Sequence, residues 1–290
     1  MALALITLSP SGYRIARELA RTLPEAELFV HRSCCEGQAA AFDSVVALTG
    51  EIFGRMRALV YIAPCGVAVR AIAPNLRHKT TDPGVVAIDV AGRYVVSLAG
   101  GHEGGANQLA YRLASLLGAE PVVSTSTEAA RSVIVGVGCR RGTPAEAILS
   151  AVREALRLAG SSLDEVRVLA SATLKADEPG LLEAAERLGV PLRLLTPGEI
   201  RSTAKAFAPS QLVERKVGLP AVAEPAALLA GRRTRLLLPR KVFDGVTVAV
   251  AREDSWWSES DREADWTEPA APSRPSPSAG SSSATSATSN

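Results

Sequence analysis

Three short polar segments contain most of the residues in this sequence that could perform acid/base chemistry. Two are glycine-flanked turns, residues 100–107 (GGHEGGAN) and residues 136–142 (GVGCRRG). Each follows an apolar run typical of a strand and precedes a run typical of a helix. The third, residues 175–179 (KADEP), follows another strand-like run. Together they supply an imidazole, cations and carboxylates, which suit an anionic substrate that undergoes acid/base chemistry.

Turns of this kind collect the ligand of an open α/β sheet, because backbone N–H groups at a helix start and side chains at the carboxyl end of a strand converge there. We therefore expect a site built from these segments. The candidate catalytic residues are His102, Lys175, Asp177 and Glu178, and the candidate substrate-binding residues are Gly101, Gly104, Gly105, Asn107, Gly138, Cys139, Arg140 and Arg141.

Each candidate also has a structural interpretation. A histidine in a turn is more often a capping or local hydrogen-bonding residue than a catalyst. Arg140 and Arg141 could merely be solvated, or they could bind carboxylates in a bidentate manner. We favour carboxylate binding. Residues 175–178 could form only a salt-bridged helix start with a favourable dipole contact, and this interpretation has the same weight as a direct role.

The two glycine turns resemble nucleotide-binding loops only in part. The spacing of Gly136, Gly138 and Gly142 is one residue too long for a dinucleotide fingerprint, and Asp164 precedes the next strand instead of ending it. The histidine turn has no lysine, so it is not a P-loop. A nucleotide-binding module that uses the arginine turn is therefore the weakest alternative.

Composition restricts the class of protein. A chain of 290 residues with 47% hydrophobic content can form two ordinary domains with sizeable cores. The four cysteines lack the spacing of a disulfide framework or a zinc site, so we expect reduced thiols and no metal site. No apolar run is long enough for a membrane span, and the first residues lack a basic flank, which predicts a cytoplasmic protein.

The formal net charge of +2 hides a division along the chain. Residues 253–290 contain seven acidic residues and two arginines, which leaves residues 1–252 at +7. A basic body can bind nucleic acid, but that function requires interleaved aromatic residues, and only 4% of this chain is aromatic. Residues 253–290 become rich in Pro, Ser, Ala and Thr, and we expect this tail to be disordered.

Strand-like and helix-like runs alternate along the body, which predicts the α/β class. We expect two α/β domains: residues 1–123, an open sheet with flanking helices, and residues 132–252, a mixed sheet with helices, joined by a linker at 124–131. The predicted strands are Ala2–Leu8, Glu27–Val30, Leu59–Ala63, Val85–Val90, Tyr94–Leu98, Val133–Val137, Val166–Ser171, Leu192–Leu195, Arg235–Pro239 and Val246–Ala251. Predicted helices follow residues 9–12, 64–66, 105, 143 and 180, with Pro144 at the first helical position.

Several of these segments occur together in one family. Residues 101–107, with 73–76 (APNL) and 79–84 (KTTDPG), resemble the amino-terminal part of the CbiG family of cobalamin biosynthesis. The second half resembles the carboxyl-terminal domain of that family, which CobE proteins share. Its motifs are residues 136–143 (GVGCRRGT), 175–182 (KADEPGLL) and 242–249 (VFDGVTVA). The resemblance covers nearly all of residues 1–252.

The resemblance implies a cobalt-precorrin-5A hydrolase, which opens the δ-lactone between the ring A acetate and C20 and releases acetaldehyde to give cobalt-precorrin-5B. Such a reaction requires a base for water, a donor for the oxyanion and an acid for the departing oxygen. We assign His102 as the base, the cations Arg140, Arg141 and Lys175 as substrate clamps or oxyanion donors, and Asp177 or Glu178 as proton carriers or orienting groups. These roles come from the residue types and not from the family.

The resemblance also implies the partners. The substrate is a tetrapyrrole that brings its own cobalt, so no cofactor is expected, and other cobalamin-pathway enzymes are candidate partners. Members of the family carry a further middle segment, for which residues 121–132 leave almost no room. We expect a compact variant with its site between residues 1–123 and 132–252. The alternative function is a non-catalytic corrinoid-binding or hand-over protein, in which His102 would ligate cobalt.

Overall fold

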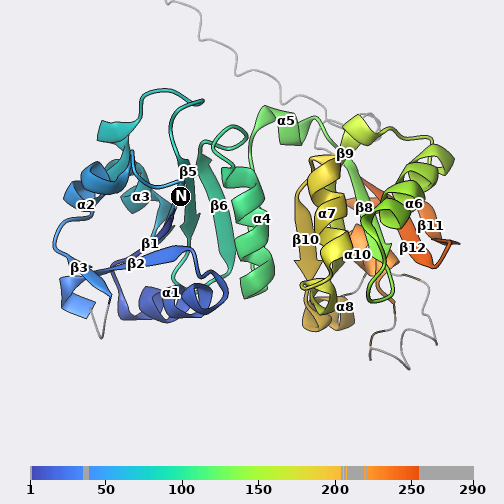
Figure 1. Ribbon diagram of the computed structural model, residues 1–290, viewed down its shortest axis with the longest axis horizontal. Coiled ribbons are helices and arrows are strands. Elements are labelled where there is room, and N and C mark those ends of the chain that lie inside the picture. Colours follow the sequence, from blue (N-terminus) through green and yellow to red (C-terminus); the bar gives the residue numbers. More distant parts are fainter. Residues whose placement is uncertain are drawn as a thin grey trace, which may run out of the picture. The chain divides into compact units, whose positions relative to one another are not determined.

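Two β-sheets follow one another along the chain, and helices cover both faces of each (Figure 1). The computed structural model describes residues 2–34, 39–203, 205, 207, 219 and 221–254. The predicted α/β class with two sheets and flanking helices is confirmed. Residues 255–290 of the predicted disordered tail lie outside the described residues.

The first sheet has seven strands, with a reversal at one position. The strands are β1 (Leu3–Thr7), β2 (Ala26–His31), β3 (Ala40–Phe42), β4 (Ala58–Ile62), β5 (Gly84–Ile88), β6 (Tyr94–Ala99) and β7 (Glu120–Val122). Their order is β3-β2-β1-β4-β5-β6-β7. Every neighbouring pair is parallel except β5 and β6, which form the predicted hairpin. β6 therefore ends at the edge of the sheet where β5 begins.

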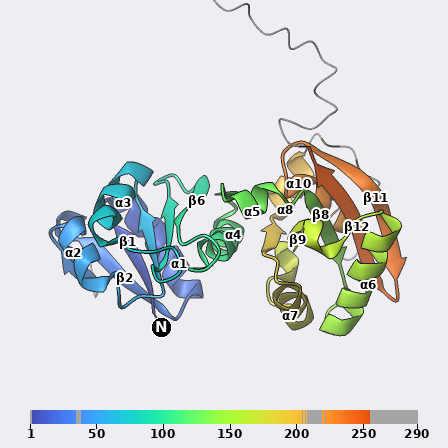
Figure 2. The same ribbon diagram turned by 90° about the horizontal axis from the view of Figure 1, so that it is seen from above.

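The central strands of this sheet are buried along their whole length, as expected for a parallel sheet covered on both faces. Two helices, α1 (Pro10–Thr22) and α4 (Ala106–Leu117), share a core on one face. Two others, α2 (Val45–Ile52) and α3 (Cys65–Ile72), share a core on the opposite face (Figure 2). The sheet is thus the middle of three layers.

The second sheet is mixed, as predicted. Its strands are β8 (Val133–Gly138), β9 (Val166–Ala172), β10 (Leu192–Leu195), β11 (Thr234–Phe243) and β12 (Val246–Glu253), in the order β10-β9-β8-β12-β11. The first three strands are parallel, whereas β12 is antiparallel to both of its neighbours. α6 (Ala145–Leu158) and α7 (Pro179–Leu188) cover one face, and α8 (Pro197–Ser202) and α10 (Ala223–Leu229) cover the other (Figure 2).

Helix α4 contributes side chains to the cores of both sheets. Ala110 and Leu113 pack in the core of the first sheet, whereas Tyr111 packs in a core of the second. The Ser115 hydroxyl accepts a 2.9 Å hydrogen bond from the backbone N–H of Leu194 in the edge strand β10. This bond satisfies a donor that an edge strand would otherwise leave unpaired. The helix therefore links the two sheets through apolar and polar contacts.

Several short elements were not predicted from the sequence. They are β3, β7, α2, α8, α10 and the four-residue helix α5 (Ser126–Ala129), which lies inside the expected linker. Elements this short contain too few residues for their hydrophobic period to stand out. Single-turn 3-10 helices also occur at Arg32–Cys34, Ala73–Asn75, Leu163–Glu165 and Thr173–Lys175. No helix in the described part of the chain is long and apolar enough to cross a membrane.

Three predicted boundaries in the second half require correction. Pro144 is not the first helical residue: its ψ of 148° is extended, and it caps α6 from outside. β11 continues past Pro239 to Phe243, because a register shift between Leu238 and Lys241 accommodates a residue that cannot donate to the ladder. β12 includes Glu253, which was assigned to the tail, because its carboxylate accepts a 2.7 Å hydrogen bond from the backbone N–H of Arg232.

The close packing of α10 on β8 gives a stability prediction. A Cβ at Gly136 would overlap the carbonyl oxygen of Ala223 and lie 2.7 Å from the backbone nitrogen of Ala227, whereas the nearest atom to a Cβ at Gly138 is 3.6 Å away. We expect Gly136→Ala to lower the free energy of unfolding by about 3 kcal/mol or more, because backbone atoms must move. Gly138→Ala is expected to change it by less than about 1 kcal/mol. Urea denaturation of both variants measures the difference, and equal effects would contradict the close approach.

Candidate functional site

The arginine turn joins the carboxyl end of β8 to α6. Arg140 and Arg141 are exposed, and the carbonyl oxygen of Arg140 accepts a 2.8 Å hydrogen bond from the Thr143 hydroxyl. Gly142 has a φ of +75°, in the left-handed region that glycine adopts without strain. A hydrogen bond to its backbone therefore fixes the turn, while both guanidinium groups remain accessible to solvent.

The segment after β9 lies against this turn, and Glu178 connects them. The Glu178 side chain is 3% exposed and accepts a 2.8 Å hydrogen bond from the backbone N–H of Gly142. Its second carboxylate oxygen lies 3.4 Å from Nζ of Lys175. A Cβ at Gly180 would overlap the carbonyl oxygen of Thr143, so the starts of α6 and α7 pack directly against each other. Two helix N-termini thus meet beside three cations.

A third segment reaches the same edge of the sheet through strand register. Thr247 pairs with Gly138, which places the turn at Asp244 and Gly245 beside the arginine turn. Both turn residues have positive φ values, 46° and 87°, as a tight two-residue hairpin requires. All three family motifs of the second half therefore converge on one edge, although they lie up to about a hundred residues apart in the chain.

The charges at this edge suit the binding of anions. Arg141 and Asp177 form a 3.5 Å ion pair, but their side chains are 82% and 74% exposed, so the pair contributes little stability and a ligand carboxylate can replace it. Burial raises the pKa of the Cys139 thiol, Lys175 opposes the shift and Glu178 adds to it. A raised pKa keeps Cys139 a thiol at neutral pH, which makes it a packing residue and not a nucleophile.

We expected the histidine turn at the carboxyl ends of the parallel strands, but it lies at their amino ends. It follows the carboxyl end of β6, but because β6 is antiparallel to β5, that end lies beside the first residue of β5. A Cβ at Gly104 would lie 2.8 Å from the backbone nitrogen of Gly84, which begins β5. The turn is therefore near the amino ends of β4 and β5, and not at the carboxyl ends, where parallel strands usually collect their ligands.

Most of the polar and glycine residues of the histidine turn have structural contacts. Asn107 is 5% exposed, its Oδ1 accepts a 2.8 Å hydrogen bond from the Ser97 hydroxyl, and its Nδ2 donates a 3.0 Å bond to the Thr125 hydroxyl. A Cβ at Gly101 would lie 2.7 Å from the Thr125 methyl group, and Gly105 has a φ of +76° at the start of α4. His102, in contrast, is exposed.

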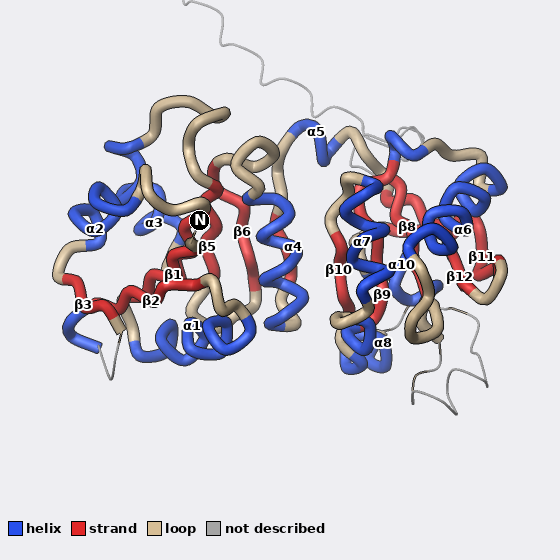
Figure 3. Tube along the Cα trace, in the orientation of Figure 1, coloured by secondary structure: helices blue, strands red, loops and turns tan. Residues whose placement is uncertain are grey.

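The long loop before β5 reaches the same turn. Lys79, in the loop at residues 76–83 that Figure 3 shows above the first sheet, lies 3.8 Å from the carboxylate of Glu103. Both groups are partly solvent-exposed, so this ion pair is weak. Glu103 is therefore charge-paired with Lys79, and His102 is the exposed imidazole of the turn.

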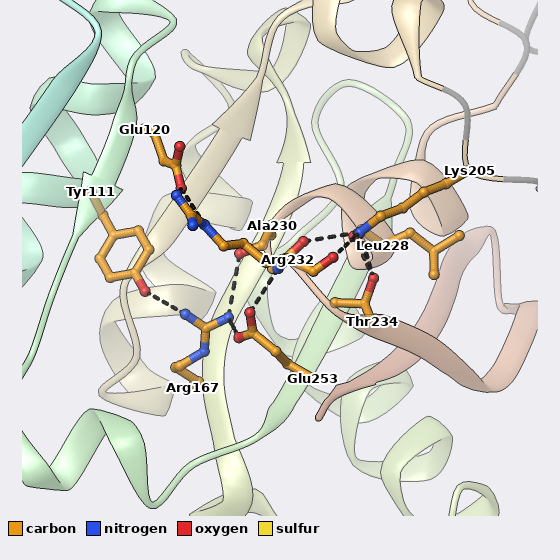
Figure 4. Close-up of polar contacts among 10 residues, drawn as sticks. Tyr111, Glu120, Arg167, Lys205, Leu228, Ala230, Arg232, Thr234 and Glu253 are labelled. Atoms are coloured by element: carbon orange, nitrogen blue, oxygen red, sulfur yellow. Dashed lines mark hydrogen bonds and ion pairs between the residues drawn. The ribbon is translucent and has the colours of Figure 1, made fainter. Parts of the chain in front are cut away.

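A polar network lies between α4 and the amino end of β9 (Figure 4). Arg167 donates hydrogen bonds to the hydroxyl of Tyr111 (3.2 Å) and the carbonyl oxygen of Ala230 (3.4 Å) and forms an ion pair with Glu253. Arg232 donates from its side chain to Glu120 at 2.8 Å. The network thus joins the first half, through α4 and β7, to the second half.

Lys205 lies on the side of this network away from Tyr111 (Figure 4). Its ammonium group donates to the carbonyl oxygens of Leu228 (2.6 Å), Gly231 (3.1 Å) and Arg232 (2.9 Å), and it lies 2.9 Å from the Thr234 hydroxyl. Leu228 is in the last turn of α10 and the other two carbonyls follow that helix, where a cation is favourable to the helix dipole. Lys205 therefore stabilises the chain between α10 and β11.

The expected single site is divided between two regions. The histidine turn leads directly into α4, and Tyr111 of that helix accepts a hydrogen bond from Arg167 at the amino end of β9. Lys175 follows the carboxyl end of the same strand. The five-residue step from Arg167 to Ala172 is roughly 17 Å at about 3.3 Å per residue. The structure therefore brings Lys175, Asp177, Glu178 and Arg141 together, but it does not bring His102 to them.

Sequence reasoning missed one buried acid, Glu128 in α5. The Glu128 side chain is 8% exposed, and no described residue donates a hydrogen bond to its Oε2. The pattern Thr125-x-x-Glu128 has the form of a capping box, which signals a helix start but not a buried carboxylate. Among the described residues, no group of three or more His, Cys, Asp or Glu side chains is arranged to hold a metal ion.

The fold and these two edges define a two-sheet α/β protein with a cationic edge and a separate histidine turn. Two family models match the chain: Cobalamin synthesis G N-terminal at residues 47–128, and Cobalamin synthesis G C-terminus at residues 133–251. The chain belongs to the CbiG family of cobalamin biosynthesis. The predicted family is therefore confirmed.

Individual relatives show the same similarity. The chain is 28% identical to cobalt-precorrin-5A hydrolase of Salmonella typhimurium, over 86% of this chain and 97% of that protein. It is 35% identical to protein CobE of Sinorhizobium, over 43% of this chain and 83% of that protein. The crystal structure of a CobE protein matches 42% of this chain and 89% of its own, with 36% identity and a TM-score of 0.39.

The alignment with the Salmonella protein spans 343 positions, more than the 290 residues of this chain, so that protein has residues with no counterpart here. The two family models are separated in this chain by residues 129–132 alone. Both observations agree with the short middle segment predicted from the sequence.

The contacts of Glu178 predict a structural effect when it is replaced. Glu178→Ala would remove the buried carboxylate that accepts the Gly142 N–H, and we expect it to lower the free energy of unfolding by about 1.5–3 kcal/mol. Asp177→Ala removes a neighbouring carboxylate whose ion pair is exposed, so its effect is expected to be below about 0.5 kcal/mol. Thermal denaturation of both variants tests this. Equal stability of the two variants would indicate that Glu178 has a catalytic role and does not support the structure of the arginine turn.

Proposed function

We propose that this chain is a cobalt-precorrin-5A hydrolase, which opens the δ-lactone of its substrate and yields cobalt-precorrin-5B and acetaldehyde. Two relatives with that name, from Salmonella typhimurium and Priestia megaterium, are 28% and 25% identical and are covered over 97% and 94% of their length. In this proposal the cobalt belongs to the substrate, and the protein supplies no cofactor.

The observation that carries the proposal is the cationic edge of the second sheet. Arg140 and Arg141 are exposed beside two adjoining helix starts, and Lys175 lies behind them against Glu178. Guanidinium groups bind carboxylates through paired hydrogen bonds, and helix N-termini favour anions. A tetrapyrrole carries acetate and propionate arms around its rim, so this edge suits the binding of one or more of those arms.

The lactone chemistry is assigned to the histidine turn. Hydrolysis consumes one water: a base removes a proton from the water, the hydroxide adds to the lactone carbonyl, and the ring C–O bond breaks as the departing oxygen takes up a proton. The C20 hydroxyl set free in this way then gives up its proton as the C–C bond between C20 and the macrocycle breaks. C20 and its methyl group leave as acetaldehyde, and the macrocycle keeps the bonding electron pair and takes up a proton. His102 is exposed and can accept the first proton and return it at the second step. Because the arms surround the macrocycle, arm binding and lactone opening do not require the same residues.

The direct test is acetaldehyde release from purified cobalt-precorrin-5A, with corrinoid absorbance recorded in the same reaction. We expect stoichiometric acetaldehyde and a catalytic turnover. A change in corrinoid absorbance that is stoichiometric with the protein, with no release of acetaldehyde, would contradict the hydrolase and support the corrinoid hand-over function.

The binding role of the arginine turn predicts a change in KM. Each charge-assisted contact is worth roughly 1.5–3 kcal/mol, so replacing Arg140 and Arg141 together with Ala should raise KM at least about tenfold, while the melting temperature stays unchanged. Lys replacements should restore only part of the affinity, because they lose the bidentate fork. The double variant Arg14→Ala/Arg17→Ala removes two exposed arginines from α1 and serves as the control. An unchanged KM in the Arg140→Ala/Arg141→Ala variant would show that these arginines are solvated surface residues that do not bind substrate.

The base role of His102 predicts a loss of turnover. His102→Asn keeps a polar side chain but cannot carry a proton at neutral pH, so kcat should fall roughly 10²–10⁴-fold while substrate still binds. His31→Asn, at the end of β2, changes a histidine outside both turns and should retain wild-type turnover. A kcat within a few-fold of wild type for His102→Asn would leave His102 a structural residue.

A further inference from the structure

Glu128 is a buried acid without a hydrogen-bonded partner. It lies in α5, its side chain is 8% exposed, and Oε2 receives no hydrogen bond from any described residue. Burying a carboxylate in this state costs free energy, and native proteins keep such groups mainly where they have a function. The other buried acids among the described residues have partners instead: Glu178 accepts from Gly142 and pairs with Lys175, and Glu224 accepts from the backbone N–H of Arg240.

The backbone places Glu128 beside the histidine turn. Thr125 precedes α5, and its hydroxyl accepts the 3.0 Å hydrogen bond from Asn107, while its methyl group fills the space where Gly101 lacks a Cβ. The N–H of Ala129 donates to the carbonyl oxygen of Thr125 at 3.0 Å, which fixes the single turn of α5. His102 follows Gly101 directly, so α5 is anchored on the residue next to the imidazole.

The charged and titratable groups that interact electrostatically with Glu128 come from four segments of the chain. They are His102 from the histidine turn, Tyr111 from α4, Arg131 after α5 and Arg167 from β9. Arg167 already donates to Tyr111 and Ala230 and pairs with Glu253, and it forms no ion pair with Glu128. Burial raises the pKa of the Glu128 carboxyl, and the positive charges of Arg167, Arg131 and His102 oppose the shift.

We propose that Glu128 is a positioning residue for His102: the exposed imidazole turns toward α5, and the carboxylate oxygen that is free in this structure then accepts its N–H. In that geometry the carboxylate orients the ring and stabilises the positive charge that forms when His102 takes a proton from water. The proton stays on the imidazole, and Glu128 remains ionised. This role rests on the proposed hydrolysis, whereas the contact between Glu128 and His102 can be tested without substrate.

The first test compares stability at two pH values. An acid whose pKa is raised by folding costs stability when it ionises, so the cost is absent below its unfolded pKa and grows as the pH rises through its folded pKa. Glu128→Gln should therefore raise the melting temperature at about pH 7 and leave it unchanged at about pH 4. Glu178 is a buried acid that has two partners, so Glu178→Gln should lower the melting temperature at about pH 7. A lower melting temperature for Glu128→Gln at neutral pH would make Glu128 a structural residue and overturn the proposal.

The second test measures the contact directly, with the protein alone. Diethyl pyrocarbonate modifies a ring nitrogen of histidine, and an imidazole held by a hydrogen bond to a buried carboxylate is less accessible to the reagent. Peptide mapping should show His102 modified several-fold faster in Glu128→Gln than in the wild type, because the ring is held less firmly. His31 and His78, the other two histidines of the chain, are internal references and should react at equal rates in both proteins. An equal rate at His102 would overturn the contact.

The third test uses turnover. Glu128→Gln should lower kcat about 10–100-fold with KM unchanged, which is the range for a group that acts through a first-contact residue. In a His102→Asn background the same change should cost nothing more, because its effect passes through the imidazole. If the fall in kcat of the double variant equals the product of the falls in the two single variants, the positioning role is overturned. A wild-type protein that releases no acetaldehyde would overturn the hydrolase, while the modification rates would still decide the Glu128–His102 contact.

Discussion

The packing of α4 between the two sheets determines most of what the rest of the molecule can do. One side of the helix fills the core of the first sheet, and from the same helix Tyr111 packs on the second sheet while Ser115 accepts a hydrogen bond from its edge strand. The helix begins at the histidine turn, so its position also places His102 and the anchored helix α5. Because only residues 123–132 connect the two sheets, these contacts, and not a long linker, define the relation between the two halves.

The two functional regions arise from two different uses of glycine. At the carboxyl edge of the second sheet, Gly180 lets α7 approach the arginine turn so closely that Glu178 can accept the N–H of Gly142. In the histidine turn, Gly101 and Gly104 remove the side chains that would collide with Thr125 and β5. In both turns the motif residues mainly build a rigid support, and the accessible groups, Arg140, Arg141 and His102, are few. This explains how a family motif can be rich in residues that never touch a substrate.

The polar network around Arg167 links the two halves by charge as well as by packing. Arg167 reaches Tyr111 in α4 and Glu253 at the end of β12, and Arg232 reaches Glu120 in β7 (Figure 4). The Arg167 side chain is mostly buried, with 17% exposed, and its acceptors come from α4 and from the second half of the chain. Glu128 differs, because it lies near this network and takes no hydrogen bond from it. That exception is the reason to assign it to the chemistry of His102.

The sequence by itself determined the α/β class, the long strands and helices, the hairpin at residues 85–98 and the family, because hydrophobic period and motif order are local properties. It also identified the cations of the arginine turn. Only the tertiary structure decided that His102 and Lys175 lie in different regions, since the antiparallel entry of β6 moves the histidine turn to the other edge of the sheet. The direction in which a strand joins a sheet depends on its partners, and the burial of Glu128 depends on side chains from α4, β9 and the histidine turn. Neither leaves a pattern in the residues nearby.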